Sequence, residues 1–228
     1  SLNDKLKATT HMLQKTQSTT MKSLAKLAEY RDMETGNHLH RICEFNRLLS
    51  SQVRERQPYS FHIADEYVED IYLSGMLHDI GKVGVPDQIL LKPQGLSEQE
   101  WDIMKKHTIW GWDLLREADQ ELGEQSFLTL ASRIALSHHE HYDGTGYPKK
   151  LKGEDIPLSA RISAVSDVYD ALTSKRPYKD AWSHERAIEE IINQKGRQFD
   201  PALVDILERI ESDFLRVKLD LPDSSMVN

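Results

Sequence analysis

The amino-acid sequence predicts an all-α protein, a bundle of helices interrupted by two long loops. From about residue 20 onward, apolar residues recur at the three- and four-residue spacing of an amphipathic helix. No two segments show the alternation of apolar and polar residues that neighbouring strands would show. Two irregular stretches, 81–97 and 142–158, are rich in Gly and Pro. Loops of that length inside a compact domain are often functional.

The first thirty residues contain no Gly or Pro and predict one long helix. Its seam has the alternating spacings of a coiled coil and comprises Leu6, Thr10, Leu13, Gln17, Thr20, Leu24 and Leu27. Because three of these seven residues are polar, the seam would be weak. Two interpretations stay open: a helix packed on its own domain, or a parallel homodimer helix that leads in from an upstream regulatory domain. The chain begins with Ser1 rather than Met, which favours missing upstream sequence.

Several of the later helices have recognisable capping residues. Ser97 and Glu100 form a capping box. Ser183 precedes a helix that should stop at Gly196, and Asp200-Pro201 begins the last helix. Helices are predicted near 20–55, 63–78, 98–118, 124–139, 159–173, 184–195 and 201–216.

The length of 228 residues fits one or two domains. We expect a linker or signalling helix at 1–23, one main domain at 24–216 and a C-terminal tail at 217–228. No apolar run is long enough to predict a membrane span, and no signal-peptide pattern is present.

The composition indicates a soluble globular protein and excludes some classes of function. Hydrophobic residues make up 39% of the chain, charged residues make up 29%, and the formal net charge is -8. A general DNA or RNA binder would need a basic face, although local cations or metals can still bind an anionic substrate. The single cysteine, Cys43, excludes an internal disulfide and a Cys-rich zinc site. It favours a cytoplasmic location.

Two pairs of adjacent residues carry the chemistry. His78-Asp79 ends an apolar stretch, and His138-His139 precedes the Gly-rich segment 143–148. Imidazole supplies a borderline nitrogen ligand, and a carboxylate has two oxygens that can bridge two ions. The pattern therefore predicts a cluster of two or more metal ions and a metal-dependent hydrolase.

Further residues could address the same ions, although each has an ordinary alternative. Glu34 and His38 are four residues apart and share a helix face, as many solvated surface pairs do. His107 could be a surface histidine, and Asp167 a buried acid satisfied by hydrogen bonds. Lys82 could neutralise a substrate phosphate or protonate a leaving oxygen, or simply lie in solvent. The remaining histidines are assigned no role in the site; they are His11, His40, His62, His141 and His184.

Taken in order, these motifs resemble the HD-GYP family of bacterial cyclic-dinucleotide phosphodiesterases, a branch of the HD-domain metal hydrolases. The resemblance runs from about residue 24 to about residue 204. It rests on the segments 34–38, 78–82, 105–107, 138–140, 143–148, 151–153, 161–162, 167–173 and 176–179. So many motifs in the family order make the resemblance highly specific.

The resemblance implies an HD-domain helical bundle with a GYP loop, Gly146-Tyr147-Pro148, at the rim of the site. Family metal-ligand positions fall on Glu34, His38, His78, Asp79, His107, His138, His139 and Asp167. Asp79 would bridge two metals, and Glu34 falls on a position that helps bind a third metal in some members. Family substrate-contact positions fall on Lys82, Arg176 and Lys179. No ligand position departs from the family pattern, which argues against a catalytically dead member.

The implied activity is hydrolysis of cyclic di-GMP to linear pGpG and on to GMP, with two or three divalent ions, iron or manganese. The ions would activate water for attack on phosphorus, while Lys82 offsets the charge that grows on the phosphoryl oxygens. Arg176 and Lys179 would anchor the phosphates or a guanine edge. Two rivals stay open: a phosphodiesterase for another nucleotide such as cyclic GMP-AMP, and a non-catalytic sensing module that signals through the N-terminal helix.

Overall fold

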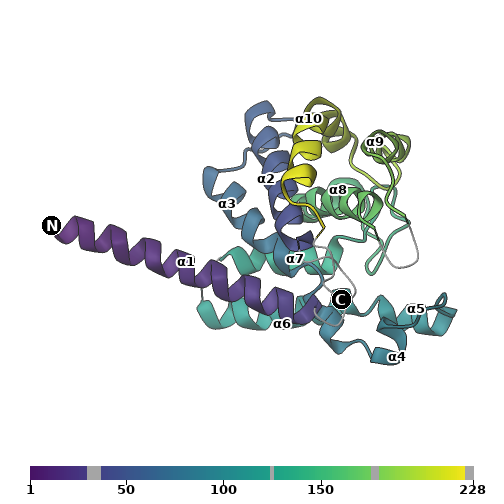
Figure 1. The fold of residues 1–228 in the computed structure, drawn as a ribbon, viewed down its shortest axis with the longest axis horizontal. Coiled ribbons are helices and arrows are strands. Elements are labelled where there is room, and N and C mark those ends of the chain that lie inside the picture. The colour runs from purple at the N-terminus through teal and green to yellow at the C-terminus, as the bar shows by residue number, and fades with distance from the viewer. Residues whose placement is uncertain (30–36, 124–125, 176–179, 224–228) are drawn as a thin grey trace.

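The computed structural model describes residues 1–29, 37–123, 126–175 and 180–223 (Figure 1). Throughout these ranges the chain forms helices, turns and loops and no β-strand, so the predicted all-α class is confirmed. The helices are α1 (Leu2–Glu29), α2 (His38–Arg56), α3 (Asp65–Ser74), α4 (Asp87–Leu90), α5 (Glu98–Met104), α6 (His107–Leu122), α7 (Phe127–Ser137), α8 (Leu158–Thr173), α9 (His184–Asn193) and α10 (Pro201–Asp220). Short 3-10 helices are η1 (Gly75–Leu77), η2 (Ile80–Gly84) and η3 (Gly153–Asp155).

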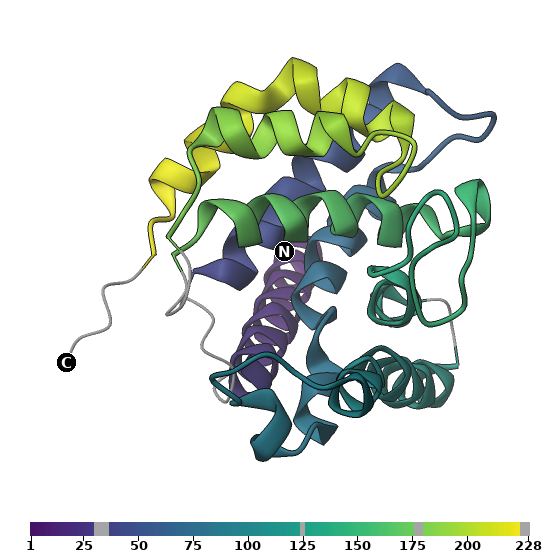
Figure 2. The same ribbon diagram turned by 90° about the vertical axis from the view of Figure 1, so that its right-hand side faces the viewer.

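Helix α8 runs through the middle of the molecule, with α9 and α10 on one side of it (Figure 2). It is buried along most of its length because α2, α7, α9 and α10 all pack against it. Phe45 of α2 stacks on Phe214 of α10 with ring centroids 4.4 Å apart, and Tyr169 of α8 meets both rings edge-on. Burying each such side chain contributes about 1.5–3 kcal/mol to folding.

A second apolar cluster joins α6 and α7 to η1 and to the last turns of α1. Ala25 of α1 is buried there with Met76 and Leu77. The preceding part of α1 projects away from the body of the protein (Figure 1). The leucines of the predicted seam are all exposed; they are Leu6, Leu13, Leu24 and Leu27. The alanine side of α1, and not the leucine seam, therefore packs on the described domain.

The predicted capping residues are confirmed at three helix starts. Ser97 and Glu100 make both hydrogen bonds of the capping box before α5. The Ser183 side chain accepts from the backbone N–H of Arg186, and Asp200 accepts from the N–H of Ala202 with proline at the first helical positions.

The helix predicted at 98–118 is broken, and this prediction was wrong. α5 ends at Met104 and α6 begins at His107, whose Nδ1 donates to the Met104 carbonyl oxygen at 2.8 Å. The turn at residues 105–106 separates the two helices. Periodicity could not reveal the break because Lys105-Lys106 contains neither Gly nor Pro.

Other helix ends also differ from the predicted ones. The helix expected at 63–78 is α-helical only to Ser74 and then tightens into η1. Gly75 packs closely there, since a Cβ on it would lie 2.4 Å from Asn46 Nδ2. The last helix continues to Asp220 and not to 216, because Val217 still packs against the main core. The predicted start of the C-terminal tail at 217 thus falls inside α10.

Candidate metal centre

The candidate metal ligands converge from five places in the fold. These are the first residue of α2, the turn between η1 and η2, the first residue of α6, the turn after α7 and the middle of α8; they carry His38, His78, Asp79, His107, His138, His139 and Asp167. The structure thus brings together seven of the eight predicted ligand residues. They form two groups, and within each group the donor atoms all lie within 4.8 Å of one another. The eighth, Glu34, lies outside the described residues.

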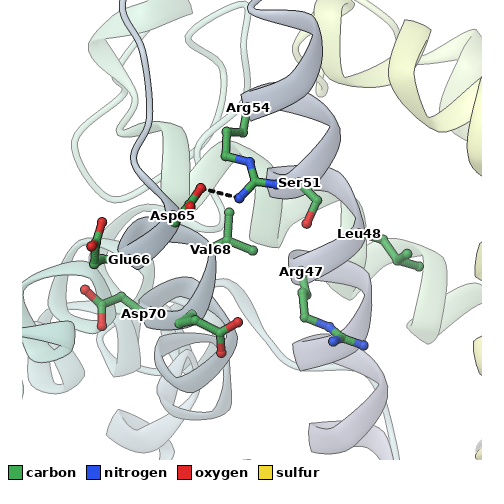
Figure 3. A pocket seen from close by; sticks show the side chains of 9 residues that line it. Arg47, Leu48, Ser51, Arg54, Asp65, Glu66, Val68 and Asp70 are labelled. Atoms are coloured by element: carbon green, nitrogen blue, oxygen red, sulfur yellow. Dashed lines mark hydrogen bonds and ion pairs between the residues drawn. The ribbon is translucent and has the colours of Figure 1, made fainter.

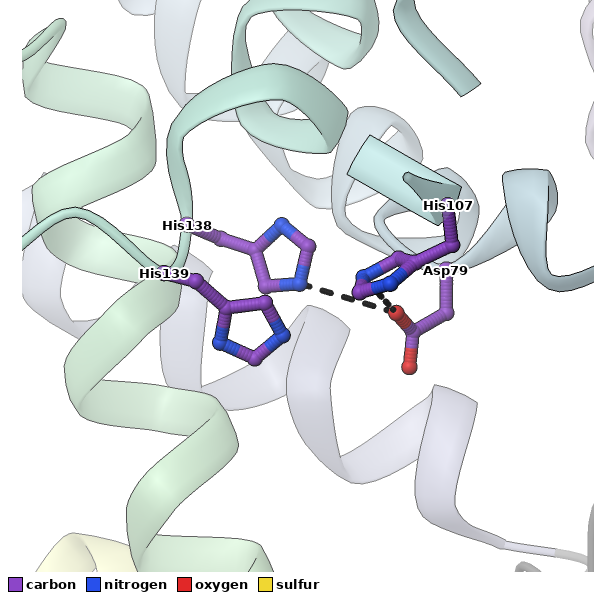
Figure 4. Close-up of side chains that lie close together, drawn as sticks. All are labelled: Asp79, His107, His138 and His139. Carbon is purple, nitrogen blue, oxygen red and sulfur yellow. Dashed lines mark ion pairs between the residues drawn. The ribbon is translucent and has the colours of Figure 1, made fainter. Parts of the chain in front are cut away.

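The first group consists of Asp79, His107, His138 and His139, which point toward one another in Figure 4. The second group consists of His38, His78 and Asp167. His78 and Asp79 are neighbours in sequence but belong to different groups, so the turn between η1 and η2 joins the two.

The Asp79 carboxylate lies between the two groups with one oxygen toward each. Its Oδ1 is 3.2 Å from His107 Nε2 and 3.5 Å from His138 Nε2. Its Oδ2 is 3.3 Å from His78 Nε2. A carboxylate placed in this way can contact two ions at once.

The tautomers of three of the candidate histidines are fixed by backbone contacts outside the site. Nδ1 donates to a carbonyl oxygen in three cases: His78 to Gly75 at 2.9 Å, His107 to Met104 at 2.8 Å, and His138 to Ile134 at 2.9 Å. A carbonyl can only accept, so in each neutral ring the lone pair is on Nε2. These three buried Nε2 atoms find no hydrogen-bond partner among the described residues.

This arrangement fits a metal site. Buried lone pairs that face one another and a carboxylate repel one another unless a cation lies between them. Metal-binding histidines usually donate the other ring nitrogen to a carbonyl or a carboxylate, as these do. The donor set of imidazoles and carboxylates suits divalent ions such as iron, manganese or zinc.

The charges of the site also favour a cation. Burial raises the pKa of Asp79, but Lys82 and His78 outweigh burial and hold that pKa well below its usual value. Burial lowers the pKa of His138 and lowers the pKa of His139 still further, so both rings are neutral at pH 7. Burial also lowers the pKa of His78, but the Asp79 carboxylate outweighs it and raises that pKa to about 9. A proton would thus compete with a metal ion for the Nε2 lone pair of His78.

The sequence analysis missed two residues that hold His38. The Asp170 carboxylate lies 2.8 Å from His38 Nδ1 and also pairs with Arg41. All three side chains are buried. A helical signal was available, since Arg41 follows His38 by three residues and Asp170 follows Asp167 by three.

Lys82 lies within the site, with its Nζ 2.7 Å from Asp79 Oδ2 and most of its side chain buried. It is carried by η2, which packs closely against α6 at Gly81. A Cβ on Gly81 would lie 1.9 Å from the His107 carbonyl oxygen. Only glycine allows this approach, which brings Asp79 and Lys82 to the start of α6.

The Gly146-Tyr147-Pro148 loop lies directly against the first group. The Tyr147 ring stacks on His139 with centroids 4.9 Å apart. A Cβ on Gly146 would lie 2.2 Å from the backbone nitrogen of His141, so the loop folds back closely on the turn after α7. Glu140, which the sequence analysis left without a role, accepts the backbone N–H groups of Lys149 and Leu151 and fixes the far end of the loop.

Arg176 and Lys179 lie outside the described residues. The five histidines that were assigned no role belong to neither group of candidate ligands. One of them, His184, instead contacts the Tyr169 hydroxyl through its Nδ1 at 2.9 Å.

A groove of about 810 Å³ lies elsewhere, between α2 and α3 (Figure 3). Its walls carry charges of both signs, and Arg54 pairs with Asp65 across it. None of the described candidate ligands lines this groove. The chemistry of the protein is therefore assigned to the metal centre and not to the groove.

Comparisons with known proteins agree with this geometry. A family model described as HD domain matches residues 59–203. A cyclic di-GMP phosphodiesterase of Vibrio cholerae is 44% identical over 222 residues, which cover 97% of this chain and 45% of that protein. A 3'3'-cGAMP-specific phosphodiesterase 2 of the same organism is 40% identical over 211 residues, which cover 92% of this chain and 38% of that protein. The chain thus spans less than half the length of either relative.

A solved structure supports the same fold. The crystal structure of a cyclic GMP-AMP specific phosphodiesterase of V. cholerae matches with a TM-score of 0.55 at 22% sequence identity, over 91% of this chain and 54% of that chain. Within the part of the chain that the structure describes, no helix has both the length and the apolar character needed to cross a membrane.

Proposed function

This chain belongs to the HD domain family, in its HD-GYP branch, and on that premise we propose that it is a metal-dependent phosphodiesterase acting on a cyclic dinucleotide. One observation carries the proposal: seven histidine and aspartate residues form two adjoining groups of donors, with the Asp79 carboxylate between them. The proposed substrate is cyclic di-GMP, cut to linear pGpG and then to GMP, since the 44% identical relative is a cyclic di-GMP phosphodiesterase.

The metal ligands that we propose are the two groups described above, with Asp79 shared between them. Divalent ions held there would supply a nucleophile from water at neutral pH and positive charge for the phosphoryl oxygens. The chain contributes imidazoles whose Nε2 atoms are aimed into the site by carbonyl groups behind them. Because these carbonyls belong to the backbone, the ligands are fixed before any substrate arrives.

Lys82 is the proposed catalytic side chain besides Asp79. Its ammonium group lies 2.7 Å from Asp79 and is largely shielded from solvent. A cation in this place can offset the charge that grows on a phosphoryl oxygen or donate a proton to the leaving oxygen. Arg176 and Lys179 are proposed as further phosphate or guanine contacts, and the loop Gly146-Tyr147-Pro148 as the rim over the substrate.

The number and identity of the ions are part of the proposal. The two described groups account for two ions. Glu34 would add a third, and it precedes His38 by four residues at the start of α2. Iron or manganese suits histidine–carboxylate ligands, and the resemblance to HD-GYP proteins favours them.

A second candidate substrate is 3'3'-cyclic GMP-AMP, favoured by the relative that is 40% identical and specific for that compound. The two substrates differ in one purine base, while the described donors would address the phosphates that both share. The difference would therefore depend on contacts to the base and not on the metal groups.

We also propose that α1 forms a parallel dimer and connects the domain to an upstream regulatory domain. The support is that its leucine seam is exposed, with Leu6 and Leu13 each 64% exposed. The relatives are more than twice as long as this chain, which leaves room for such a domain. A cytoplasmic location is proposed on the same grounds as in the sequence analysis, the single cysteine.

The test combines metal analysis with turnover. Protein purified without oxygen should contain two or three ions of iron or manganese per chain and should hydrolyse cyclic di-GMP faster than cyclic GMP-AMP. Faster hydrolysis of cyclic GMP-AMP would favour the second candidate. Full metal content without hydrolysis of either compound would instead indicate a sensing module.

A further inference from the structure

A buried ion pair holds His38 from the side opposite to the metal groups. His38 Nδ1 lies 2.8 Å from Asp170 Oδ2. Arg41, on the next turn of α2, donates to the same carboxylate through Nε at 2.5 Å and through Nη2 at 2.9 Å. The Arg41 and Asp170 side chains are only 0% and 2% exposed. Packing and hydrogen bonds therefore set the direction of the Asp170 carboxylate, and this carboxylate sets the direction of the His38 ring.

The end of the described chain supplies part of the Arg41 environment. Besides Asp170, the Arg41 guanidinium donates through Nη2 to Ser174 Oγ at 3.0 Å and through Nη1 to the Leu221 carbonyl oxygen at 2.9 Å. Nη1 also pairs with Asp223 Oδ1 at 2.9 Å. A guanidinium has five N–H donors, so these contacts match its full capacity. Residues after α10 accept the two contacts of Nη1.

Residues 221–223, here called the C-terminal clasp, are fastened at further points. The Pro222 carbonyl oxygen accepts from Asn37 Nδ2 at 2.6 Å, next to His38 itself. Lys218 Nζ lies 3.5 Å from Asp223 Oδ2 and 3.7 Å from Asp170 Oδ1. The clasp thus bridges the end of α10 and the start of α2. Its two carbonyl oxygens contact Asn37 and Arg41, and its carboxylate contacts Arg41 and Lys218.

We propose that the C-terminal clasp is a positioning element for the metal ligand His38. Through Arg41 and Asp170, the clasp holds the His38 ring in the direction and tautomer that a metal ion needs. It thereby sets how tightly the group of His38, His78 and Asp167 retains its ion. The inference rests on the proposed function, because it concerns one of the two metal groups of that site.

The expected effect follows from how far the clasp lies from the ion. Changing a residue that directly contacts a metal ligand typically weakens metal binding about 10–100-fold. Asp223 lies two contacts further out, beyond Arg41 and Asp170. Its substitution is therefore expected to weaken metal binding by about three- to tenfold. In the other group, backbone carbonyls lie behind the His107 and His138 rings, so this group should not change.

The test uses the full chain and manganese(II) alone as the probe. Titration calorimetry of the metal-free protein gives the affinities, and release into a chelator gives the rates. Asp223→Ala should lower the affinity for one manganese ion about three- to tenfold and speed the release of that ion by a similar factor. The affinity for the other ion should not change. Asp223→Asn, which keeps an acceptor for Arg41, should give a smaller change in the same ion, and Asp223→Glu should restore parental binding.

The matched control is Asp213→Ala. Asp213 also lies in the C-terminal region, in α10, and its ion pair is with Arg216 of the same helix. This control should leave both ions unchanged, and the unfolding temperature of the metal-free protein should be similar in both alanine variants.

Three results would overturn the inference. The first is parental manganese affinity and release rate in both Asp223→Ala and Asp223→Asn. The second is an equal loss of affinity in Asp213→Ala, and the third is an equal loss of affinity for both ions in Asp223→Ala. Different results would contradict the proposed function. If the parent protein binds no manganese and hydrolyses no cyclic dinucleotide, the function is wrong and the clasp proposal falls with it. If the parent binds metal and is active while the Asp223 variants match it, the clasp proposal alone is wrong.

Discussion

Replacing Gly81 with alanine would test how closely η2 packs against α6. A Cβ at residue 81 would lie 1.9 Å from the carbonyl oxygen of His107 and 2.5 Å from the backbone nitrogen of Gly111. Both are backbone atoms of α6, so no side chain can rotate out of the way. Since Cβ contacts under 3.0 Å are essentially never observed, η2 and α6 would have to separate by about 1 Å.

The magnitude follows from that separation. Ordinary overpacking of a core costs about 1–3 kcal/mol, and a clash between two backbone segments belongs at or above the upper end of this range. We expect Gly81→Ala to lower the free energy of unfolding by about 3 kcal/mol or more. For a chain of this size, 3 kcal/mol corresponds to a fall of about 6–12 °C in Tm. The same separation would widen the 3.2 Å contact between Asp79 Oδ1 and His107 Nε2, so the first metal group should lose its ion.

Thermal unfolding of the metal-free protein measures the first effect, and the metal-to-protein ratio measures the second. The matched control is Gly95→Ala, in the same predicted loop, where a Cβ would meet nothing within 4 Å. That control should change stability by no more than about 0.5 kcal/mol. If Gly81→Ala unfolds at the same temperature as Gly95→Ala and keeps full metal content, the reasoning about η2 and α6 is refuted.

Four further outcomes are expected. Asp79→Ala should lower the metal-to-protein ratio by at least about one and abolish hydrolysis, because it removes the anion between the two groups; normal turnover at full metal content would contradict the bridging role. Glu34→Ala should lower the ratio by about one while the other ions stay, and an unchanged ratio would indicate a two-metal site. Arg176→Ala and Lys179→Ala should each weaken substrate binding by about 1.5–3 kcal/mol, roughly tenfold or more, at unchanged metal content; ordinary affinity in the double variant would exclude both as anchors. Deleting residues 1–20 should shift the sedimentation profile toward monomer or alter turnover with the metal site intact, and identical profiles would show a passive linker.

Local sequence determined the helical class and most of the candidate site. Helical periodicity and capping depend on residues a few positions apart, so Ser97, Ser183 and Asp200 marked helix starts that the structure contains. Adjacent donors such as His78-Asp79 and His138-His139 can be read directly from the sequence, and the order of the motifs is typical of the HD-GYP family.

The tertiary structure decided which atoms of those donors face one another. The carbonyls of Gly75, Met104 and Ile134 fix the histidine tautomers, and a carbonyl is present at every residue, so it carries no sequence signal. The division of the Asp79 oxygens between two groups depends equally on how separate helices pack.

Long-range contacts also explain what the sequence analysis missed. Asp170 and Arg41 are 129 positions apart, and Asp223 reaches Arg41 from the other end of the chain. The break between α5 and α6 falls at two lysines, and the close approach at Gly81 falls in a stretch with several glycines. Helix periodicity reports only which face of a helix is apolar, whereas these contacts depend on which other helix that face meets and at what distance.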